Sequence, residues 1–511
     1  MFPLRMGSPA SFATVRDFLK KSGYSEEFLK SHFSVPALEP LLMPQGLLFQ
    51  HFEKLYQGEG AALFLTRLFL GGYATPRQLF HKYCPREVMD ALLELGLVQE
   101  VRGSHHDLRS PVLLYPAYGL YIASDAGPRM EGVTGYQGQD FVMSGTEDIC
   151  RDFIDGFPKT PCERFLDMGT GSGLAAILGA GFAKHAWAVD ITERATRFAN
   201  FNRMLNGVDN LTILRGDLFE PVKDLQFDRI VSNPPFEPPL KSHMIYSEGG
   251  SDGEQILARL VQQAPEHLVA GGRLYANVCG TDRDGETFDE RVVRWLGVYR
   301  EEVDVALFVR LELKPEQYAI QQMLGENQES WRLHEYNAFY GSLRAYQVVI
   351  GMLVIQRRTR PRPVFRVRRK LGLRSGVEHM DWLMDLEARL LDEGMPQRLM
   401  QAAPVATSHW ELVARHAFRE GRLSPVSYAF QTKQPFEVEL NVAPWIAMVV
   451  ADCNGRHTLE SLYDSLQKKA PISEGQFLEA MRALLSCDIL RLPGESVPEP
   501  LSGPVRHYFL Q

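Results

Sequence analysis

Two short motifs in this chain carry residue types suited to ligand chemistry. The first, at 167–173, reads Asp-Met-Gly-Thr-Gly-Ser-Gly; it follows the strand-like run 164–166 and leads into the helix-like run 174–178. A glycine-rich turn between a strand and a helix lets the backbone approach a nucleotide-like ligand closely, although it also occurs as a plain connection. The first candidate binding residues are therefore Asp167, Gly169, Thr170, Gly171 and Gly173.

The second motif, Asn-Pro-Pro-Phe at 233–236, ends the strand-like run 227–232. An amide or an aromatic amine is a poor nucleophile because its lone pair is delocalised. The Asn233 side-chain oxygen and the Pro234 carbonyl can both accept N–H bonds from one NH₂ group, which aims that nitrogen at an electrophile. An aromatic ring can stack on the planar group. The motif therefore predicts catalytic roles for Asn233, Pro234, Pro235 and Phe236. The simpler interpretation is a proline-rich loop that only ends a strand.

Acidic residues follow the next two strand-like runs. Asp190 ends the run 186–190, where a carboxylate can hold ribose hydroxyls. Asp217 follows the run 211–215 and is placed to bond an adenine amino group, with Leu218 beside the ring. Acids at three successive strand ends are harder to explain by chance than the glycine turn by itself. We therefore expect a nucleoside-containing cofactor at this edge.

Two other segments have both a binding and a capping interpretation. Thr146, in Ser-Gly-Thr-Glu-Asp at 144–148, precedes the first strand and is expected either to contact the cofactor or to cap a helix. The glycine-rich segment 246–253 precedes a helix-like run at 254–257. It is expected to be a lid over the target pocket, with Asp252 as its polar contact, or a plain helix cap.

The elements that position these residues alternate between strand and helix, which predicts βαβ units and a parallel sheet. Right-handed crossovers then bring the ligand to the carboxyl ends of the strands. We predict an α/β, Rossmann-like domain with seven strands, the last antiparallel, at 164–168, 186–190, 211–215, 227–232, 272–278, 303–311 and 346–356.

The flanking regions read as mainly helical, winged-helix-like domains. On the N-terminal side, Thr75 and Pro76 have the pattern of a helix cap and first turn. On the C-terminal side, Thr458 and Ser473 have the pattern of helix caps. The expected domains are a helical domain at 1–135, the Rossmann-like domain at 136–358, a basic linker with a helical segment at 359–435, and a winged-helix-like domain at 436–511.

Composition narrows the class of protein. A length of 511 residues predicts two to four domains, and 45% hydrophobic and 23% charged residues are ordinary for a globular chain. A net charge of −8 argues against coating nucleic acid through global charge. Six scattered cysteines without a Cys-x-x-Cys pair indicate a reduced compartment and no metal site. Neither a signal peptide nor a long apolar run is present, so we expect a cytoplasmic protein without membrane contact.

A basic stretch at 357–374 contrasts with the acidic whole. It contains Arg357, Arg358, Arg360, Arg362, Arg366, Arg368, Arg369, Lys370 and Arg374. Its two interpretations are a solvated linker or sheet edge, and a strip that contacts the phosphates of RNA or an acidic partner.

Residues 140–357 resemble class I S-adenosylmethionine-dependent methyltransferases, in particular the release-factor glutamine N5-methyltransferases and their relatives that methylate base amines. The matching positions are Asp167, Gly169, Gly171, Asp190, Asp217 and 233–236, and 249–253 is similar to a glycine-aspartate segment of the glutamine enzymes. Those enzymes usually have Tyr where this chain has Phe236, and ribosomal guanine-N2 enzymes more often have Phe. The full chain resembles a larger bacterial methyltransferase family of about five hundred residues.

The resemblance implies S-adenosyl-L-methionine as cofactor and N-methylation of a planar nitrogen, without a metal or covalent nucleophile. The leading expectation is a side-chain amide of Gln or Asn in a protein or peptide partner. The glycine-aspartate segment favours it. The alternative is an exocyclic base amine in RNA or DNA, which the basic stretch favours. A third hypothesis is a non-catalytic binding protein on a methyltransferase scaffold.

Overall fold

The computed structural model describes residues 2–42, 58–101, 103–104, 106–127, 135–238, 240, 244–326, 332–419 and 421–501. The chain divides into two compact units, Met1–Asn277 and Val278–Gln511. Within the described residues, no helix is long and apolar enough to cross a bilayer.

The N-terminal part of the first unit is helical, with two small antiparallel sheets. Its helices are α1 (Pro9–Lys21), α2 (Glu26–Phe33), α3 (Glu39–Leu42), α6 (Ala61–Leu65), the π-helical η1 (Thr66–Leu70), α7 (Arg77–Tyr83) and α8 (Arg86–Glu94). One sheet has the order β1-β3-β2, and the other is the hairpin β4-β5. The strands are β1 (Thr75–Pro76), β2 (Gln99–Glu100), β3 (Asp107–Arg109), β4 (Leu113–Ala117) and β5 (Leu120–Ser124).

One local prediction in this region was wrong. Thr75 does not cap a helix: it pairs with Leu108 across β1 and β3, and its hydroxyl donates to the Tyr73 carbonyl at 3.1 Å. Helix α7 begins only at Arg77. The strand partner that holds Thr75 in an extended conformation lies more than thirty residues away, so a local cap pattern does not reveal it.

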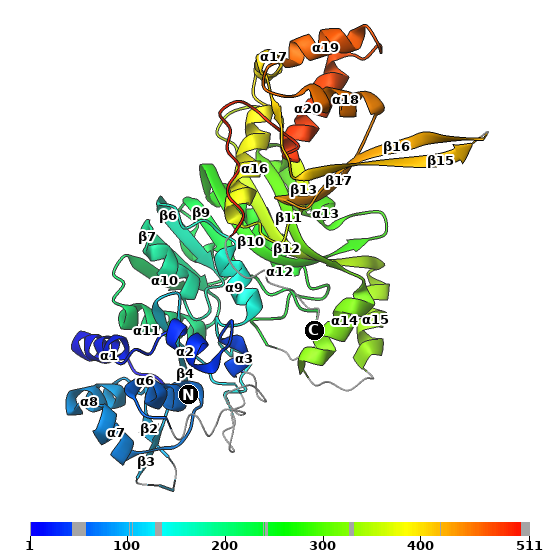
Figure 1. The fold of residues 1–511 in the computed structure, drawn as a ribbon. Helices are drawn as coiled ribbons and strands as arrows, with labels where there is room; N and C mark the ends of the chain where they lie inside the picture. The colour runs from blue at the N-terminus through cyan, green and yellow to red at the C-terminus, as the bar shows by residue number, and fades with distance from the viewer. Residues whose placement is uncertain are drawn as a thin grey trace. The chain divides into compact units, whose positions relative to one another are not determined.

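The central part of the first unit is a parallel sheet with the order β10-β9-β6-β7-β8. Its strands are β6 (Cys162–Met168), β7 (Ala183–Asp190), β8 (Leu211–Arg215), β9 (Phe227–Ser232) and β10 (Leu268–Arg283), which continues past Asn277 into the second unit. Helix α9 (Asp148–Asp155) precedes β6, and the helices between the strands are α10 (Leu174–Ala180), α11 (Glu193–Asn206), η2 (Glu220–Val222), α12 (Gln255–Gln263) and η3 (Ala264–His267) (Figure 1).

The second unit contains a mixed arrangement of strands in the order β15-β16-β17-β13-β11-β12. β11 (Val303–Leu313) pairs antiparallel with β12 (Ala345–Arg357) and parallel with β13 (Arg366–Leu371). β15 (Trp410–Arg419), β16 (Arg422–Thr432) and β17 (Phe436–Val442) follow as an antiparallel meander. The helices before this meander are α13 (Phe288–Trp295), η4 (Gly297–Glu301), α14 (Pro315–Glu326), α15 (Arg332–Ser342), α16 (Val377–Leu390) and α17 (Met395–Gln401).

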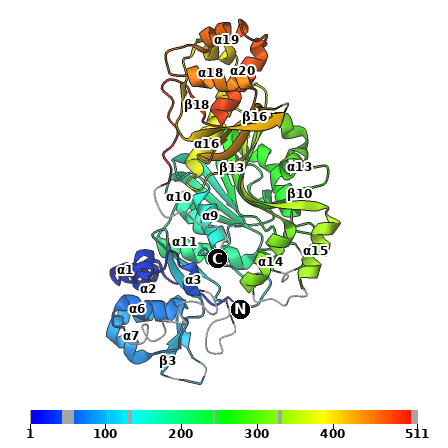
Figure 2. The same cartoon turned by 45° about the vertical axis from the view of Figure 1, so that its right-hand side comes forward.

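Helices α18 (Pro444–Asp452), α19 (Leu459–Gln467) and α20 (Glu474–Ser486) gather at the end of the second unit (Figure 2). The pair β14 (Val405–Ala406) and β18 (Leu490–Arg491) lies with them. The expected caps are confirmed, because Thr458 accepts from the Ser461 amide at 3.2 Å and Ser473 accepts from the Gln476 amide at 3.3 Å. Apolar side chains of these helices, such as Phe477 and Leu484, form their shared core.

The α/β fold class is confirmed, and all seven predicted strands lie within or largely overlap observed ones, with the antiparallel β11–β12 pair at the end. The expected number of seven strands was too low, because β13 to β17 were not anticipated: 359–435 was expected to be linker and helix, and 436–442 part of a mainly helical domain. The winged-helix assignment of both flanks and the four domain limits stay predictions.

Candidate active site

The register of the parallel sheet brings the two motifs together. Met168 of β6 pairs with Ser232 of β9, so the glycine turn and the Asn-Pro-Pro-Phe turn leave neighbouring strands at the same level. The Ser232 hydroxyl donates to the Met168 carbonyl at 2.9 Å and ties the two strand ends together. On the other side of β6, Met168 pairs with Val189, which places Asp190 beside the glycine turn. The site therefore lies at the carboxyl edge of the sheet.

The three glycines of the first motif have different surroundings. All three have positive φ: +76° at Gly169, +54° at Gly171 and +85° at Gly173. A Cβ built on Gly169 or Gly171 would meet nothing within 4 Å, whereas one on Gly173 would lie 2.9 Å from the Ala199 Cβ of α11. Gly169 and Gly171 thus leave open space over the turn, and Gly173 permits the close approach of a helix.

Asp167 holds the glycine turn from inside. Its side chain is buried, and Oδ2 accepts from the Thr170 hydroxyl at 2.5 Å and from the Ala176 amide at 3.1 Å. Burial raises the pKa of the Asp167 carboxyl to about 7, although both hydrogen bonds favour the ionised form. In this structure the side chains of Asp167 and Thr170 are therefore bound to each other within the turn.

Asp190 forms the next wall of the site. Its Oδ2 accepts from the Gly171 amide at 3.0 Å, and its Oδ1 accepts from the Thr192 amide and hydroxyl at 2.9 and 3.0 Å. Burial raises the pKa of this carboxyl as well. The carboxylate joins the glycine turn to the start of α11 while remaining half-buried at the strand end.

Asp217 and Leu218 lie just beyond β8. Leu218 is half-buried and has φ +48°, the left-handed region that a side chain seldom adopts. Asp217 Oδ2 forms an ion pair with Arg259 Nη2 of α12 at 2.6 Å, and both side chains are more than 40% exposed. Sequence reasoning missed Arg259, because the pair links α12 to a strand end 42 residues earlier.

Thr146 lies in a segment that is fixed against the start of α10. Its hydroxyl is 3.0 Å from the Ser144 hydroxyl, and α9 has no side-chain cap, so capping by these residues is not seen. The Gly145 amide donates to the buried Tyr115 hydroxyl at 2.6 Å, and a Cβ on Gly145 would lie 2.6 Å from Leu174. Tyr115, from the N-terminal hairpin, was not predicted.

Asn202 is another residue that the sequence did not single out. From α11, its buried side-chain amide donates to the carbonyls of Ser172 in the glycine turn and Ala123 in β5, both at 2.8 Å. The Ala123 amide donates back to Asn202 Oδ1 at 2.8 Å. The N-terminal hairpin therefore helps to hold the glycine turn.

In the second motif, Asn233 Oδ1 accepts from Asn277 Nδ2 of β10 at 2.9 Å. Pro234 is buried, while Asn233, Pro235 and Phe236 are half-buried. Asn277 was missed, although it ends the apolar run 274–276. Its place follows from the pairing of Ala276 with Ser232, which puts the next residues of the two strands side by side.

The segment 244–253 packs directly on the second motif. The Glu237 amide donates to the Ser247 carbonyl at 2.7 Å, and the Gly249 amide donates back to Glu237 at 2.9 Å. A Cβ on Gly253 would lie 2.9 Å from the Phe236 carbonyl oxygen. Asp252 Oδ1 accepts from the Glu254 amide at 3.0 Å in a turn that precedes α12, and the N-cap of α12, Glu254, has no side-chain capping bond.

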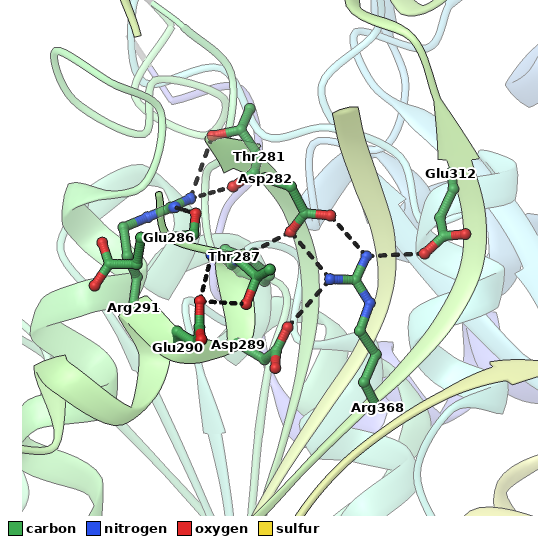
Figure 3. A network of polar contacts seen from close by, with 10 residues as sticks. Thr281, Asp282, Glu286, Thr287, Asp289, Glu290, Arg291, Glu312 and Arg368 are labelled. Carbon is green, nitrogen blue, oxygen red and sulfur yellow. Dashed lines mark hydrogen bonds and ion pairs between the residues drawn. The ribbon is translucent and has the colours of Figure 1, made fainter. Parts of the chain in front are cut away.

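The basic stretch belongs to the second unit, where most of its charged groups have acidic partners. Arg368 donates to Asp282 at 2.9 and 3.0 Å, to Asp289 at 3.1 Å and to Glu312 at 2.8 Å (Figure 3). Further ion pairs are Arg360–Asp392, Arg362–Asp304, Arg366–Glu301 and Lys370–Glu437. The stretch therefore carries less uncompensated positive charge than its sequence indicates.

Within the described ranges, no group of three or more His, Cys, Asp or Glu side chains could hold a metal ion. The open turn at Gly169 and Gly171, the half-buried Asp190 carboxylate and the neighbouring Asn233 amide form the arrangement of an α/β methyltransferase domain.

Comparisons with known proteins agree with that class. Residues 145–281 match the family described as "Methyltransferase small domain". The ribosomal protein uL3 glutamine methyltransferase of Bradyrhizobium diazoefficiens is 36% identical over 160 residues, which cover 29% of this chain and 50% of that protein. The release factor glutamine methyltransferase of Geobacter sulfurreducens is 33% identical over 164 residues, which cover 28% of this chain and 57% of that protein.

A solved methyltransferase structure from Pyrococcus furiosus matches with a TM-score of 0.29 at 18% identity, covering 47% of this chain and 90% of that one. The matched regions cover 50% and 57% of the two glutamine methyltransferases named above, so this chain spans only about half of their length. Residues 145–281 carry a methyltransferase small domain of the S-adenosylmethionine-dependent class, related to release-factor and uL3 glutamine methyltransferases.

Proposed function

We propose that this chain is an S-adenosylmethionine-dependent N-methyltransferase that acts on a side-chain amide of a protein or peptide. The observation that carries the proposal is the register of β6, β9 and β10, which sets the Asn233 amide beside the open glycine turn. When bound, the cofactor supplies a methyl group already activated on a sulfonium. The enzyme then has mainly to position the target nitrogen.

The residues of the site fit this cofactor. The open space over Gly169 and Gly171 admits a nucleoside close to the backbone, and Asp190 is placed to accept from ribose hydroxyls. Asp217 and Leu218 would hold the adenine, and Thr146 would lie toward the methionine end. We assign Asp167, Thr170 and Gly173 to shaping the turn, because their contacts are internal to the protein.

The second motif would bind the target. One amide N–H would donate to Asn233 Oδ1 and the other to the Pro234 carbonyl, with Phe236 against the planar group. The transfer would replace one N–H of the amide by N–CH₃: the bound cofactor would supply the methyl group, and the proton from the nitrogen would pass to solvent. Acceptors at both N–H groups stabilise the positive charge that develops on the nitrogen before that proton leaves.

Two observations favour an amide over a base amine. Glycines 249 and 253 pack against the Asn-Pro-Pro-Phe turn, and a similar glycine-aspartate segment occurs in glutamine methyltransferases. Four of the eight arginines that favoured RNA, Arg360, Arg362, Arg366 and Arg368, are ion-paired with Asp or Glu side chains. A base amine remains the second candidate because Phe236 occupies the place where glutamine enzymes usually have Tyr.

We further propose that the flanking regions recruit the substrate. The N-terminal set of α7, α8 and the sheet β1-β3-β2, and the C-terminal set of α18, α19, α20 and β18, have the element content of winged helices. The limits expected for them are 1–135 and 436–511. Recruiting domains outside the catalytic domain would give a small methyltransferase a specific macromolecular target.

The test is methyl transfer from labelled S-adenosylmethionine into a lysate of cells that lack this protein, separated into protein, RNA and small-molecule fractions. We expect label in the protein fraction with the native chain and none with Asn233→Ala. That variant should bind S-adenosylhomocysteine as the native chain does. Label in the RNA fraction would support the base-amine candidate, and equal label with the variant would contradict the assigned role of Asn233.

A further inference from the structure

Asn277 is a buried amide in an apolar strand. Its side chain is 1% exposed, and its neighbours Leu274, Tyr275, Ala276 and Val278 in β10 are each no more than 1% exposed. Side-chain amides are seldom fully buried unless their polar atoms are bonded. A polar residue at this position therefore calls for a physical reason.

The hydrogen bonding of Asn277 is one-sided. Its Nδ2 donates to Asn233 Oδ1 at 2.9 Å, while its buried Oδ1 has no hydrogen-bond partner in the described structure. A buried acceptor without a partner costs desolvation free energy, so an apolar side chain would suit the core better. What the amide provides is the bond to Asn233.

That bond determines the orientation of the Asn233 side chain. An asparagine amide carries an acceptor on one arm and two donors on the other, and a half-turn exchanges them. In this structure Asn277 donates, and the Asn233 oxygen is the atom that faces it. One lone pair of this oxygen is then engaged, and the second has a fixed direction.

We propose that Asn277 is a positioning residue, which fixes the Asn233 amide so that its oxygen presents one lone pair to an N–H of the target nitrogen. This inference rests on the proposed function of Asn233. It adds a partner, outside the Asn-Pro-Pro-Phe motif, that decides whether the motif faces the target with an acceptor or with a donor.

The decisive variant is Asn277→Asp, because a carboxyl group has nearly the same shape as the amide. When ionised it has no proton to donate, so it repels the Asn233 oxygen and favours the reversed amide. When protonated, its O–H can donate as the amide does. Burial raises the pKa of such a carboxyl, so the switch between its protonated and ionised forms moves toward the pH range of the assay.

Methyl transfer into the lysate protein fraction is measured for the native chain and for each Asn277 variant between pH 5.5 and 8.5. Each variant rate is divided by the native rate at the same pH. By analogy with the loss of one positioned polar group in other enzymes, the N277D rate should fall roughly 100-fold at pH 8.5. It should recover at least tenfold toward pH 5.5, with the loss in kcat rather than in cofactor affinity. Asn277→Leu should be impaired at every pH without recovery.

A second measurement does not depend on turnover. In deuterated protein labelled with ¹⁵N-asparagine, the Asn233 side-chain signal is identified by its loss in Asn233→Ala. In N277D at pH 8.5 one Asn233 Nδ2 proton should shift downfield because it donates to the carboxylate, whereas N277D at pH 5.5 should keep the native side-chain shifts. S-adenosylhomocysteine binding by calorimetry confirms that each variant is folded.

The outcomes separate the two proposals. A native chain that labels no fraction contradicts the proposed function, and the NMR signal still decides whether Asn277 orients Asn233. Asn233 side-chain shifts that are the same in N277D at both pH values overturn the inference. So does an N277D or N277L chain that methylates at the native rate across the pH range.

Discussion

The glycine turn yields a prediction that separates packing from ligand binding. In Gly173→Ala the new methyl group would meet the Ala199 Cβ at 2.9 Å and Cα at 3.0 Å, with φ at +85°. A left-handed alanine costs about 1–2 kcal/mol, and overpacking costs about 1–3 kcal/mol. The free energy of unfolding should therefore fall by about 2–5 kcal/mol, a large share of the roughly 5–15 kcal/mol that a domain has.

Gly171→Ala should behave in the opposite way. Its φ of +54° lies in the allowed left-handed region, and nothing lies within 4 Å of the added methyl group. We expect a loss of about 1 kcal/mol in stability, close to the strain alone. The methyl group would enter the space assigned to the cofactor, so binding should weaken about 10- to 100-fold, as expected for a clash of about 1.4–2.7 kcal/mol.

Urea unfolding without ligand and calorimetric titration with S-adenosylhomocysteine measure the two effects on both variants. The expected pattern is a low unfolding midpoint for Gly173→Ala and weak binding for Gly171→Ala. A Gly173→Ala chain as stable as the native one would refute the packing argument. Unchanged binding in Gly171→Ala would show that the cofactor does not approach this turn.

Three further predictions concern Asp167, Asp217 and Arg259. The Asp167 carboxyl has a pKa of about 7 in the folded chain, against an ordinary value of 3.8. The stability that this protonated carboxyl contributes is therefore fully present below pH 4 and is lost as the pH rises through 7. Asp167→Asn should flatten this decline, and an equally steep curve of unfolding free energy against pH would contradict the burial argument. Asp217→Ala should weaken S-adenosylhomocysteine binding about tenfold, the loss of one hydrogen bond of about 1.4 kcal/mol. Arg259→Ala should leave the free energy of unfolding within about 1 kcal/mol of the native value, because the ion pair is exposed. Native-like binding by Asp217→Ala would place the adenine elsewhere.

The parts of the site that the sequence predicted are those with local causes. Alternating strand and helix patterns gave β6 to β9 within a few residues, and β8 and β9 at their observed limits. Glycines at 169 and 171 and prolines at 234 and 235 mark turns by their own backbone preferences. Parallel strands then place both turns at one edge without further information.

The parts that the sequence did not predict depend on partners distant in the chain. Asn277 acquires its role from the register of β9 and β10, and Asn202 from the hairpin β4-β5. Gly173 resembles its neighbours in sequence, yet its surroundings are set by α11. The sequence leaves 366–371 open between a solvated linker, a sheet edge and a phosphate-contacting strip, and only its pairing with β11 and the opposing acids shows that it is a strand.

The central claim is that the site at the carboxyl edge of the first unit methylates a side-chain amide nitrogen. The most direct measurement is mass spectrometric mapping of the methyl group on the lysate component that the native chain labels and Asn233→Ala does not. The account predicts N-methylglutamine or N-methylasparagine at one position of a protein or peptide. A methyl group on a base amine, or on an oxygen or sulfur atom, would contradict it.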